Sequence, residues 1–169
     1  SFPDMPLVES VPVECLSPYA KSKATNEEDV VAFRKKGLNV IALRFFNVYG
    51  PGQRSDSSYA SLIPIFVHAM KSGKRPTIHG SGEQTRDFVH VHDLARAIHT
   101  MISREEPYEH PVANVASETQ ISVLEVVQCI NQGLKKRTNK KAIVPRQGHT
   151  KQADVIHTCG SDNRIQKMI

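Results

Sequence analysis

Apolar residues follow two patterns along this chain: a helical spacing of three or four residues, and short runs in which most positions are apolar. The helical spacing predicts helices over residues 18–36, 62–72, 94–104 and 122–134. The short runs predict strands over residues 39–46, 77–79, 87–91 and 143–145, and a strand end at 114–116. Residues 1–16 and 47–59, which are punctuated by proline and glycine, predict loops.

The residues at the predicted helix ends support these boundaries. Ser17 can cap the first helix, and Gly37 suits the position just after its end. Asp93 can cap the helix over residues 94–104. The segment 122–125 begins with Ser and ends with Glu, which is the pattern of a capping box, so it opens the last helix.

The alternation of helices with short strands favours the α/β class. Residues 40–46 are almost continuously apolar, which is typical of a strand buried on both faces of a parallel sheet. A doubly wound sheet needs several such strands, and this chain offers one convincing example. We therefore expect the rest of the sheet to precede Ser1.

The chain has 169 residues, about the length of one domain, and its 39% hydrophobic and 23% charged residues fit a soluble globular class. It contains no apolar run long enough to span a membrane and does not open with a signal peptide. Its three cysteines, Cys15, Cys129 and Cys159, are widely spaced and form no C-x-x-C pair. This favours a reducing, cytoplasmic location over a disulfide scaffold or zinc ribbon.

The formal net charge is +5, and basic residues cluster in the segment 134–142. Such a cluster permits an anionic partner, but we interpret it as a solvated, lysine-rich loop. Tryptophan is absent and aromatic residues are only 6%, so we predict no nucleic-acid partner. His90, His92 and Asp93 lack a further ligand at a standard spacing, so we also predict no metal site.

The strongest candidate for chemistry is a Tyr–Lys pair on the first predicted helix. Tyr19 and Lys23 are four residues apart, which puts them on one helix face about one turn apart. A lysine ammonium beside a phenol favours the phenolate, which can act as a base near neutral pH. Such a pair also occurs on ordinary amphipathic helices, so its meaning depends on the segments around it.

Those segments resemble the extended short-chain dehydrogenase/reductase family, and within it the NAD-dependent nucleotide-sugar epimerases and dehydratases of the UDP-glucose 4-epimerase type. Residues 17–23, SPYAKSK, look like the Tyr-x-x-x-Lys segment of that family. Four further blocks resemble it in the same order along the chain, at residues 43–53, 61–64, 80–93 and 114–117. Agreement among separate blocks favours this interpretation.

The resemblance implies that this chain is the C-terminal portion of a Rossmann-like fold with a smaller substrate-binding region. Residues 1–50 would end the Rossmann-like domain, and residues 51–169 would be mainly nucleotide-sugar-binding, interleaved with the Rossmann part near 87–117. The family's glycine-rich dinucleotide loop is absent, since neither G-x-G-x-x-G nor G-x-x-G-x-x-G occurs in the chain. We therefore expect the isolated chain to be inactive.

The resemblance also implies roles for individual residues. Tyr19 and Lys23 would be catalytic and would contact NAD, with Phe46 and Val48 near the nicotinamide. The residues that would contact the UDP-sugar are Asn47, Ser61, Arg86, Arg146 and Asp154. Some of these residues keep alternatives. Asn47 could be a loop residue that bonds its own backbone, and Arg86 could form an ion pair with Asp87 or another carboxylate. The segment 149–153 resembles an insertion that separates Arg146 from Asp154.

The expected activity is NAD-dependent epimerisation at C4 of a UDP-sugar through a 4-keto intermediate, in an enzyme that is a homodimer when complete. A 4,6-dehydratase and a UDP-glucuronate decarboxylase are the alternatives within the family. Outside catalysis, the alternative is a truncated or vestigial chain that binds a nucleotide-sugar.

Overall fold

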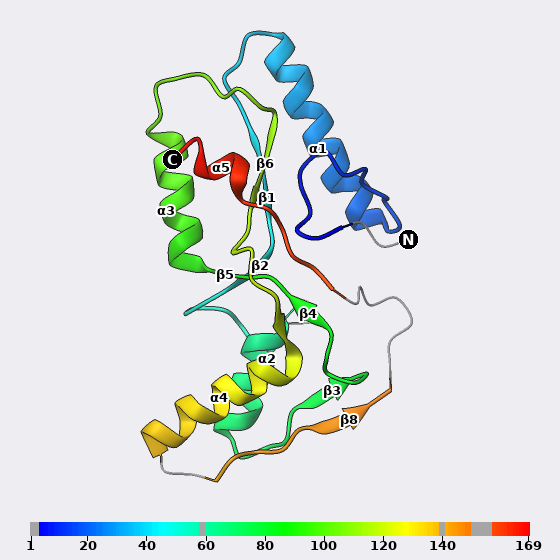
Figure 1. Cartoon of the computed structure of the whole chain (residues 1–169), viewed down its shortest axis with the longest axis vertical. Coiled ribbons are helices and arrows are strands. Elements are labelled where there is room, and N and C mark those ends of the chain that lie inside the picture. The colour runs from blue at the N-terminus through cyan, green and yellow to red at the C-terminus, as the bar shows by residue number, and fades with distance from the viewer. Residues whose placement is uncertain (1–3, 58–59, 139–140, 150–156) are drawn as a thin grey trace.

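The computed structural model describes residues 4–57, 60–138, 141–149 and 157–169, and it has the expected α/β architecture (Figure 1). Its helices are α1 (Pro18–Lys35), α2 (Leu62–Lys71), α3 (Val91–Ile102), α4 (Val123–Thr138) and α5 (Asn163–Gln166). Its strands are β1 (Ala42–Phe45), β2 (Asn47–Tyr49), β3 (Thr77–His79), β4 (Thr85–Arg86), β5 (Phe88–His90), β6 (Val112–Val115), β7 (Ile121–Ser122) and β8 (Arg146–Gly148).

Parallel pairing between distant segments organises the described strands. β1 pairs with β6, β2 with β5 and β3 with β8, all in parallel, while β4 and β7 pair antiparallel. In the first of these pairs Ala42 lies opposite Val112. Parallel strands need a long crossover, and the α/β order of the chain supplies one.

Two apolar clusters form the interior of the described residues. The first core joins α3, α5 and the strands around them through Val89, Leu94, Ala97, Met101, Ala113, Val115, Ile165 and Met168. The second core joins α2, α4 and β3 through Phe66, Met70, Ile78, Val123 and Val127. In Figure 1 the first core occupies the upper part of the molecule and the second core the lower part.

The predicted caps at the start of α1 and of α4 are confirmed. The Ala20 backbone N–H donates to Ser17 Oγ at 3.1 Å at the start of α1. At the start of α4 the Glu125 N–H donates to Ser122 Oγ, and the Ser122 N–H donates back to the Glu125 carboxylate. These bonds from Ser122 lower the pKa of Glu125, because they favour its charged form.

Two predictions around residues 39–59 are wrong in detail. β1 is shorter than predicted, and Phe45 is 49% exposed, so this strand is not buried on both faces. Residues 47–49 form β2 instead of the start of a loop, because β5 supplies hydrogen-bonding partners that no local pattern reveals.

The boundary between the predicted strand at 87–91 and the following helix is also wrong. α3 begins at Val91, where the Nδ1 atom of His90 accepts a hydrogen bond from the His92 N–H at 3.3 Å. His90 is therefore the cap, and Asp93 forms an ion pair with Arg96 instead. Asp87 lies between β4 and β5 and does not begin one strand.

Three C-terminal boundaries differ as well. β8 forms at residues 146–148, not 143–145, because the carbonyls of Val144 and Pro145 accept hydrogen bonds from Arg75. α4 continues to Thr138, beyond the predicted end near residue 134. α5, which covers the first core, was not predicted at all.

A buried carboxylate ties three distant segments together. Asp87 is fully buried, and its side chain accepts hydrogen bonds from the N–H and Oγ of Ser117, both at 2.8 Å, and from the Gly160 N–H at 3.1 Å. Its backbone carbonyl accepts from the Asn47 N–H and from Asn47 Nδ2. One residue therefore sets the relative position of β2, the segment after β6 and the segment before α5.

Gly160 also meets a tight packing constraint at this point. A Cβ atom there would lie 2.3 Å from the Phe46 ring and 2.8 Å from the Ala116 side chain. Real Cβ contacts are never this short, so only glycine lets the chain pass between Phe46 and Asp87.

Two arginines hold α1 against the rest of the fold. No residue of α1 is fully buried. Arg44 on β1 donates two bonds of 2.7 Å to the Glu27 carboxylate, and this pairing raises the pKa of Arg44. Arg34 on α1 donates to the carbonyls of Tyr108 and Val40. An ion pair and hydrogen bonds therefore hold α1 on the fold, a role that the packing of an apolar face plays for most helices of globular proteins.

We predict that Asp87→Ala lowers the free energy of unfolding by roughly 3 kcal/mol, because the Ser117 and Gly160 donors lose their acceptor in a buried site. Urea unfolding followed by circular dichroism measures this change. Asp93→Ala, which removes an exposed carboxylate, is the matched control and should shift stability little. Equal losses in the two variants would contradict the role given to Asp87.

We also predict that Glu27→Gln loosens α1 while the first core stays folded, because it removes the charge that receives both Arg44 bonds. Hydrogen–deuterium exchange should become faster in α1 and remain unchanged in α3. Glu28→Gln makes the same charge change at an exposed position of the same helix. Unchanged exchange in α1 of the Glu27 variant would show that the ion pair does not hold the helix.

Candidate functional site

The Tyr–Lys pair lies on the first turns of α1, where Ser17 and Pro18 start the helix. The ammonium nitrogen of Lys23 is 5.4 Å from the centre of the Tyr19 ring. Tyr19 is 72% exposed, so its hydroxyl is open to a ligand. The predicted proximity of the two side chains is therefore present in the folded chain.

Three more predicted site residues follow the end of β1. The Phe46 N–H donates to the Val115 carbonyl, and the Phe46 ring packs on the first core beside Gly160. Val48 also packs on the first core. Asn47 donates from its side-chain nitrogen to the Asp87 carbonyl at 3.1 Å. The alternative of a loop residue that bonds its own backbone is wrong, because Asn47 begins β2 and the carbonyl that it binds belongs to a distant segment.

Arg86 lies on β4, next to Asp87 in sequence. Its guanidinium donates to the Thr85 carbonyl at 2.9 Å and is half-buried. The Asp87 carboxylate receives its hydrogen bonds from Ser117 and Gly160, so an Arg86–Asp87 ion pair does not form. A pair with Asp87 is therefore not found, because neighbouring residues on an extended chain point to opposite sides. The pairing of Arg86 with another carboxylate stays a prediction.

The remaining predicted residues lie with the second core or outside the described residues. Ser61 is the residue before α2, and its side chain makes no capping hydrogen bond. Arg146 is exposed on β8, where it lies opposite Thr77 of β3. Asp154 lies outside the described residues. The structure thus divides the predicted site between two groups, one beside each core.

Asp87 was not identified from the sequence as a residue that holds this site in place. It holds Asn47 through its backbone, and it holds Gly160 against Phe46 through its side chain. An acidic residue flanked by the alternating residues of a strand was a visible signal, since buried carboxylates need several donors.

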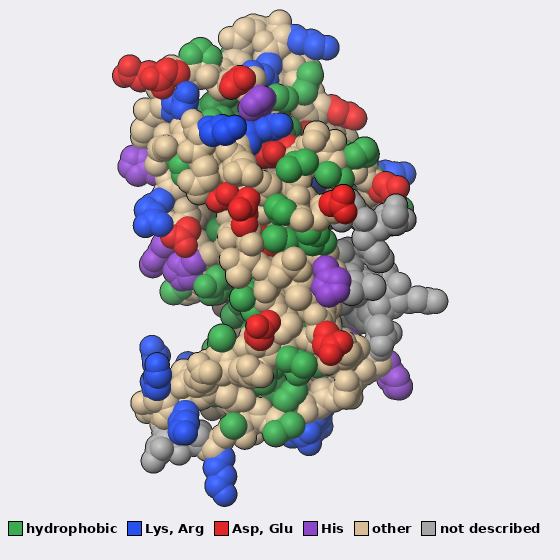
Figure 2. All heavy atoms as spheres, in the orientation of Figure 1, with side chains coloured by type: hydrophobic (Ala, Val, Ile, Leu, Met, Phe, Trp, Pro, Cys, Tyr) green, Lys and Arg blue, Asp and Glu red, His purple; other side chains and the backbone are tan. Residues whose placement is uncertain are grey.

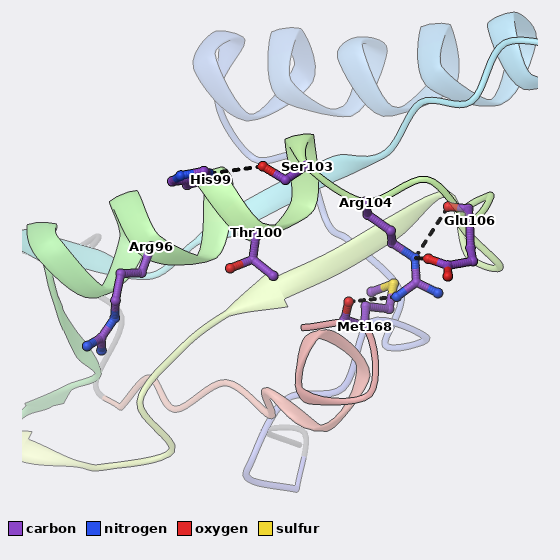
Figure 3. A pocket seen from close by; sticks show the side chains of 7 residues that line it. All are labelled: Arg96, His99, Thr100, Ser103, Arg104, Glu106 and Met168. Carbon is purple, nitrogen blue, oxygen red and sulfur yellow. Dashed lines mark hydrogen bonds and ion pairs between the residues drawn. The ribbon is translucent and has the colours of Figure 1, made fainter.

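Two cavities lie along α3, and none of the predicted site residues is among the residues that line them. One, of about 520 Å³, is lined by Tyr49, Phe88, His90, Ser117 and residues of α3 and α5. The other, of about 440 Å³, contains Arg104, whose guanidinium donates to the Met168 carbonyl at 2.7 Å and faces Glu106 (Figure 3). Because these polar groups bind one another, we regard the second cavity as a packing groove between α3 and the segment that follows α5.

His90 and His92, the histidines singled out in the sequence, lie side by side at the start of α3. The rings of His90 and His92 contact each other edge to face, with centroids 4.8 Å apart. Within residues 4–57, 60–138, 141–149 and 157–169, no three His, Cys, Asp or Glu side chains are grouped as metal ligands. In the same ranges, no helix is long and apolar enough to cross a membrane.

Sequence relatives of the chain are enzymes of nucleotide-sugar metabolism. The chain is 33% identical over 145 residues to a putative UDP-glucose 4-epimerase of Methanocaldococcus jannaschii, a match that covers 85% of this chain and 46% of that protein. It is 36% identical over 114 residues to a UDP-N-acetyl-alpha-D-glucosaminuronate decarboxylase of Bacillus cytotoxicus, covering 68% of this chain and 35% of that protein.

Comparison with solved structures finds proteins of the same kind. A solved structure of UDP-N-acetylglucosamine 4-epimerase from Methanobrevibacter ruminantium, in complex with UDP-N-acetylmuramic acid, superposes with a TM-score of 0.83 at 32% identity. That match covers 97% of this chain and 52% of the other. The chain therefore spans about half the length of these relatives or less, and it corresponds to their C-terminal part.

A family model agrees with these pairwise matches. Residues 2–116, well over half of the chain, match the NAD dependent epimerase/dehydratase family. They include the Tyr–Lys pair, β1, Asn47 and Arg86. From this match and its parallel α/β fold, the chain belongs to the NAD dependent epimerase/dehydratase family.

Proposed function

We propose that this chain forms part of an NAD-dependent enzyme that epimerises a UDP-sugar at C4. The observation that carries the proposal is the Tyr19–Lys23 pair, in which an ammonium lies 5.4 Å from the centre of an exposed phenol ring. Membership of the family supports this chemistry. So do relatives that are named as UDP-sugar 4-epimerases.

In this mechanism Tyr19 removes the proton from the 4-hydroxyl of the sugar as the general base, and the Lys23 ammonium lies beside its ring. The redox chemistry, acceptance and return of a hydride at C4, would be supplied by NAD held beside Tyr19 and Lys23. Tyr19 returns the proton as the 4-keto group is reduced. Epimerisation results when the keto sugar presents its other face to the cofactor.

Four residues of this chain would hold the nicotinamide end of NAD. Tyr19 and Lys23 are exposed, so their polar ends fit the hydroxyls of the adjoining ribose. Phe46 and Val48 are only partly buried and would form an apolar wall beside the nicotinamide. The pyrophosphate needs a glycine-rich turn, which these 169 residues do not contain, so it would be bound by residues outside them.

The UDP-sugar would extend from one predicted group of residues to the other. Asn47 suits the sugar, because it is fixed next to the end of β1, where α/β folds bind ligands. Arg86 and Arg146 suit the diphosphate, since guanidinium groups bind paired phosphate oxygens. Ser61 and Asp154 would complete the contacts to the nucleotide.

The division of the site follows the two cores, and we propose the same division for the domains. Residues 1–50 and the interleaved segment near 87–117 would belong to the Rossmann-like domain, and most of 51–169 to the nucleotide-sugar region. We further propose that the complete enzyme is a homodimer that pairs through α1. The exposed apolar residues Val31 and Phe33 of that helix support this surface.

A decarboxylase or a dehydratase is the second candidate. The 36% identity to a UDP-N-acetyl-alpha-D-glucosaminuronate decarboxylase favours the former, and relatives named dTDP-D-glucose 4,6-dehydratase favour the latter. Both begin with the same oxidation at C4 and differ in the fate of the 4-keto sugar. A chain that binds a nucleotide-sugar without catalysis is the alternative outside these classes, and the absent glycine-rich turn favours it.

We predict that Tyr19→Phe, made in the native protein that carries this chain, lowers kcat by about 10²–10⁴-fold and leaves the Kd for UDP-glucose nearly unchanged. Lys23→Met should also lower kcat, whereas Lys21→Met on the same helix should not. Chromatography of the products from UDP-glucose and UDP-glucuronate separates epimerisation from decarboxylation. A Tyr19 variant that keeps its kcat, or that loses binding alone, would rule out the role of Tyr19 as the base.

A further inference from the structure

Positive charge is distributed very unevenly along this chain. The segments 57–82 and 126–149 contain nine of its 22 Lys and Arg residues, and all 17 Asp and Glu residues lie outside these two segments. The rest of the chain therefore carries a net negative charge, although the whole chain is at +5. The segments are 43 residues apart in sequence, so their shared composition has no local cause.

Folding brings the two segments together. α2 and α4 share the second core, and β3 pairs with β8. The basic residues then gather where both helices end, in a surface that we call the basic tip: Lys71, Lys74, Lys135, Lys136, Arg137 and Lys141. Figure 2 shows Lys and Arg side chains at this lower end of the molecule, with the acidic side chains of that face lying above them.

The charges of the basic tip are not neutralised within the described part of the chain. All six side chains are exposed, and none of them forms an ion pair with a described residue. Arg75 beside them differs, because its guanidinium donates to the carbonyls of Val144 and Pro145. Basic residues at a helix C-terminus stabilise the helix by interacting favourably with its dipole. This effect is confined to the last turn, so it does not account for Lys74 and Lys141, which lie beyond the ends of α2 and α4.

We propose that the basic tip docks this protein on an anionic lipid surface. Five of its six residues are lysines, which act as hydrated point charges and suit a diffuse field of headgroups. Val144, 67% exposed beside the tip, offers an apolar side chain to such a surface. The tip contains no aromatic residue on which nucleic-acid bases could stack. The two cavities along α3 lie with the first core, so the basic tip offers an open surface and not a groove for a peptide.

The inference is independent of the catalytic proposal, because it uses none of the residues assigned to the Tyr–Lys site. Its physical consequence is a strong dependence on salt. Charges on an exposed surface interact over about 8 Å at physiological ionic strength, so higher salt should release the protein.

Co-sedimentation of the whole chain with lipid vesicles tests the proposal. The chain should bind vesicles of phosphatidylcholine mixed with phosphatidylglycerol, and it should not bind vesicles of phosphatidylcholine alone. The triple variant Lys135→Gln, Lys136→Gln, Arg137→Gln should bind the mixed vesicles roughly 100-fold more weakly, since each basic residue near an anionic surface contributes about 1 kcal/mol.

The matched control is Lys21→Gln, Lys35→Gln, Lys36→Gln, on α1 and at its C-cap. It removes the same charge from another exposed surface and should bind almost as the unchanged chain does. If the tip variant does not fold by circular dichroism, Lys71→Gln, Lys74→Gln, Lys141→Gln replaces it, with the same expected loss. The proposal is overturned if the control loses as much binding as the tip variant or if neutral vesicles bind equally well. It is also overturned if duplex DNA or polyglutamate displaces the chain from mixed vesicles at equal charge concentration.

Discussion

The buried carboxylate of Asp87 is the interaction on which the arrangement around the candidate site depends. A fully buried carboxylate is costly unless several donors surround it, and here Ser117 and Gly160 supply them. Those donors come from segments far from Asp87 in sequence, so satisfying one charge places three segments at once. Asn47 and Phe46 then take their positions from the backbone of Asp87 and from the close approach of Gly160.

A different kind of constraint positions the Tyr–Lys pair. α1 has no fully buried residue, so apolar packing does little to orient it. The bonds from Arg44 to Glu27 and from Arg34 to carbonyls near residues 108–110 hold the helix on the β1 side. Such bonds are directional, and they fix the rotation of α1 about its axis. The direction in which Tyr19 and Lys23 point therefore depends on polar contacts a few turns away.

In the function that we propose, the residues that act on the sugar lie around the first core, and residues that bind the nucleotide lie around the second core. Tyr19, Lys23 and Asn47 belong to elements around the first core, whereas Ser61 and Arg146 belong to elements around the second. The second core also carries the basic tip, at the end of the molecule away from β1. A ligand that spans both cores would be positioned by the β2–β5 pair between them, which Asp87 anchors.

Local features of the sequence determined much of this protein. The start of α1 and the capping box at Ser122 and Glu125 depend on contacts within one turn, so residue spacing was sufficient to predict them. The same holds for the Tyr19–Lys23 pair, whose contact follows from a spacing of four residues on a helix. The family too could be predicted from blocks of sequence, and the family match over residues 2–116 agrees. The tertiary structure alone decided that residues 47–49 form a strand and that Asp87 is buried. It also gathered two acid-free segments into one basic surface. Each of these depends on a partner more than 20 residues away, and spacing along the chain carries no information about such partners.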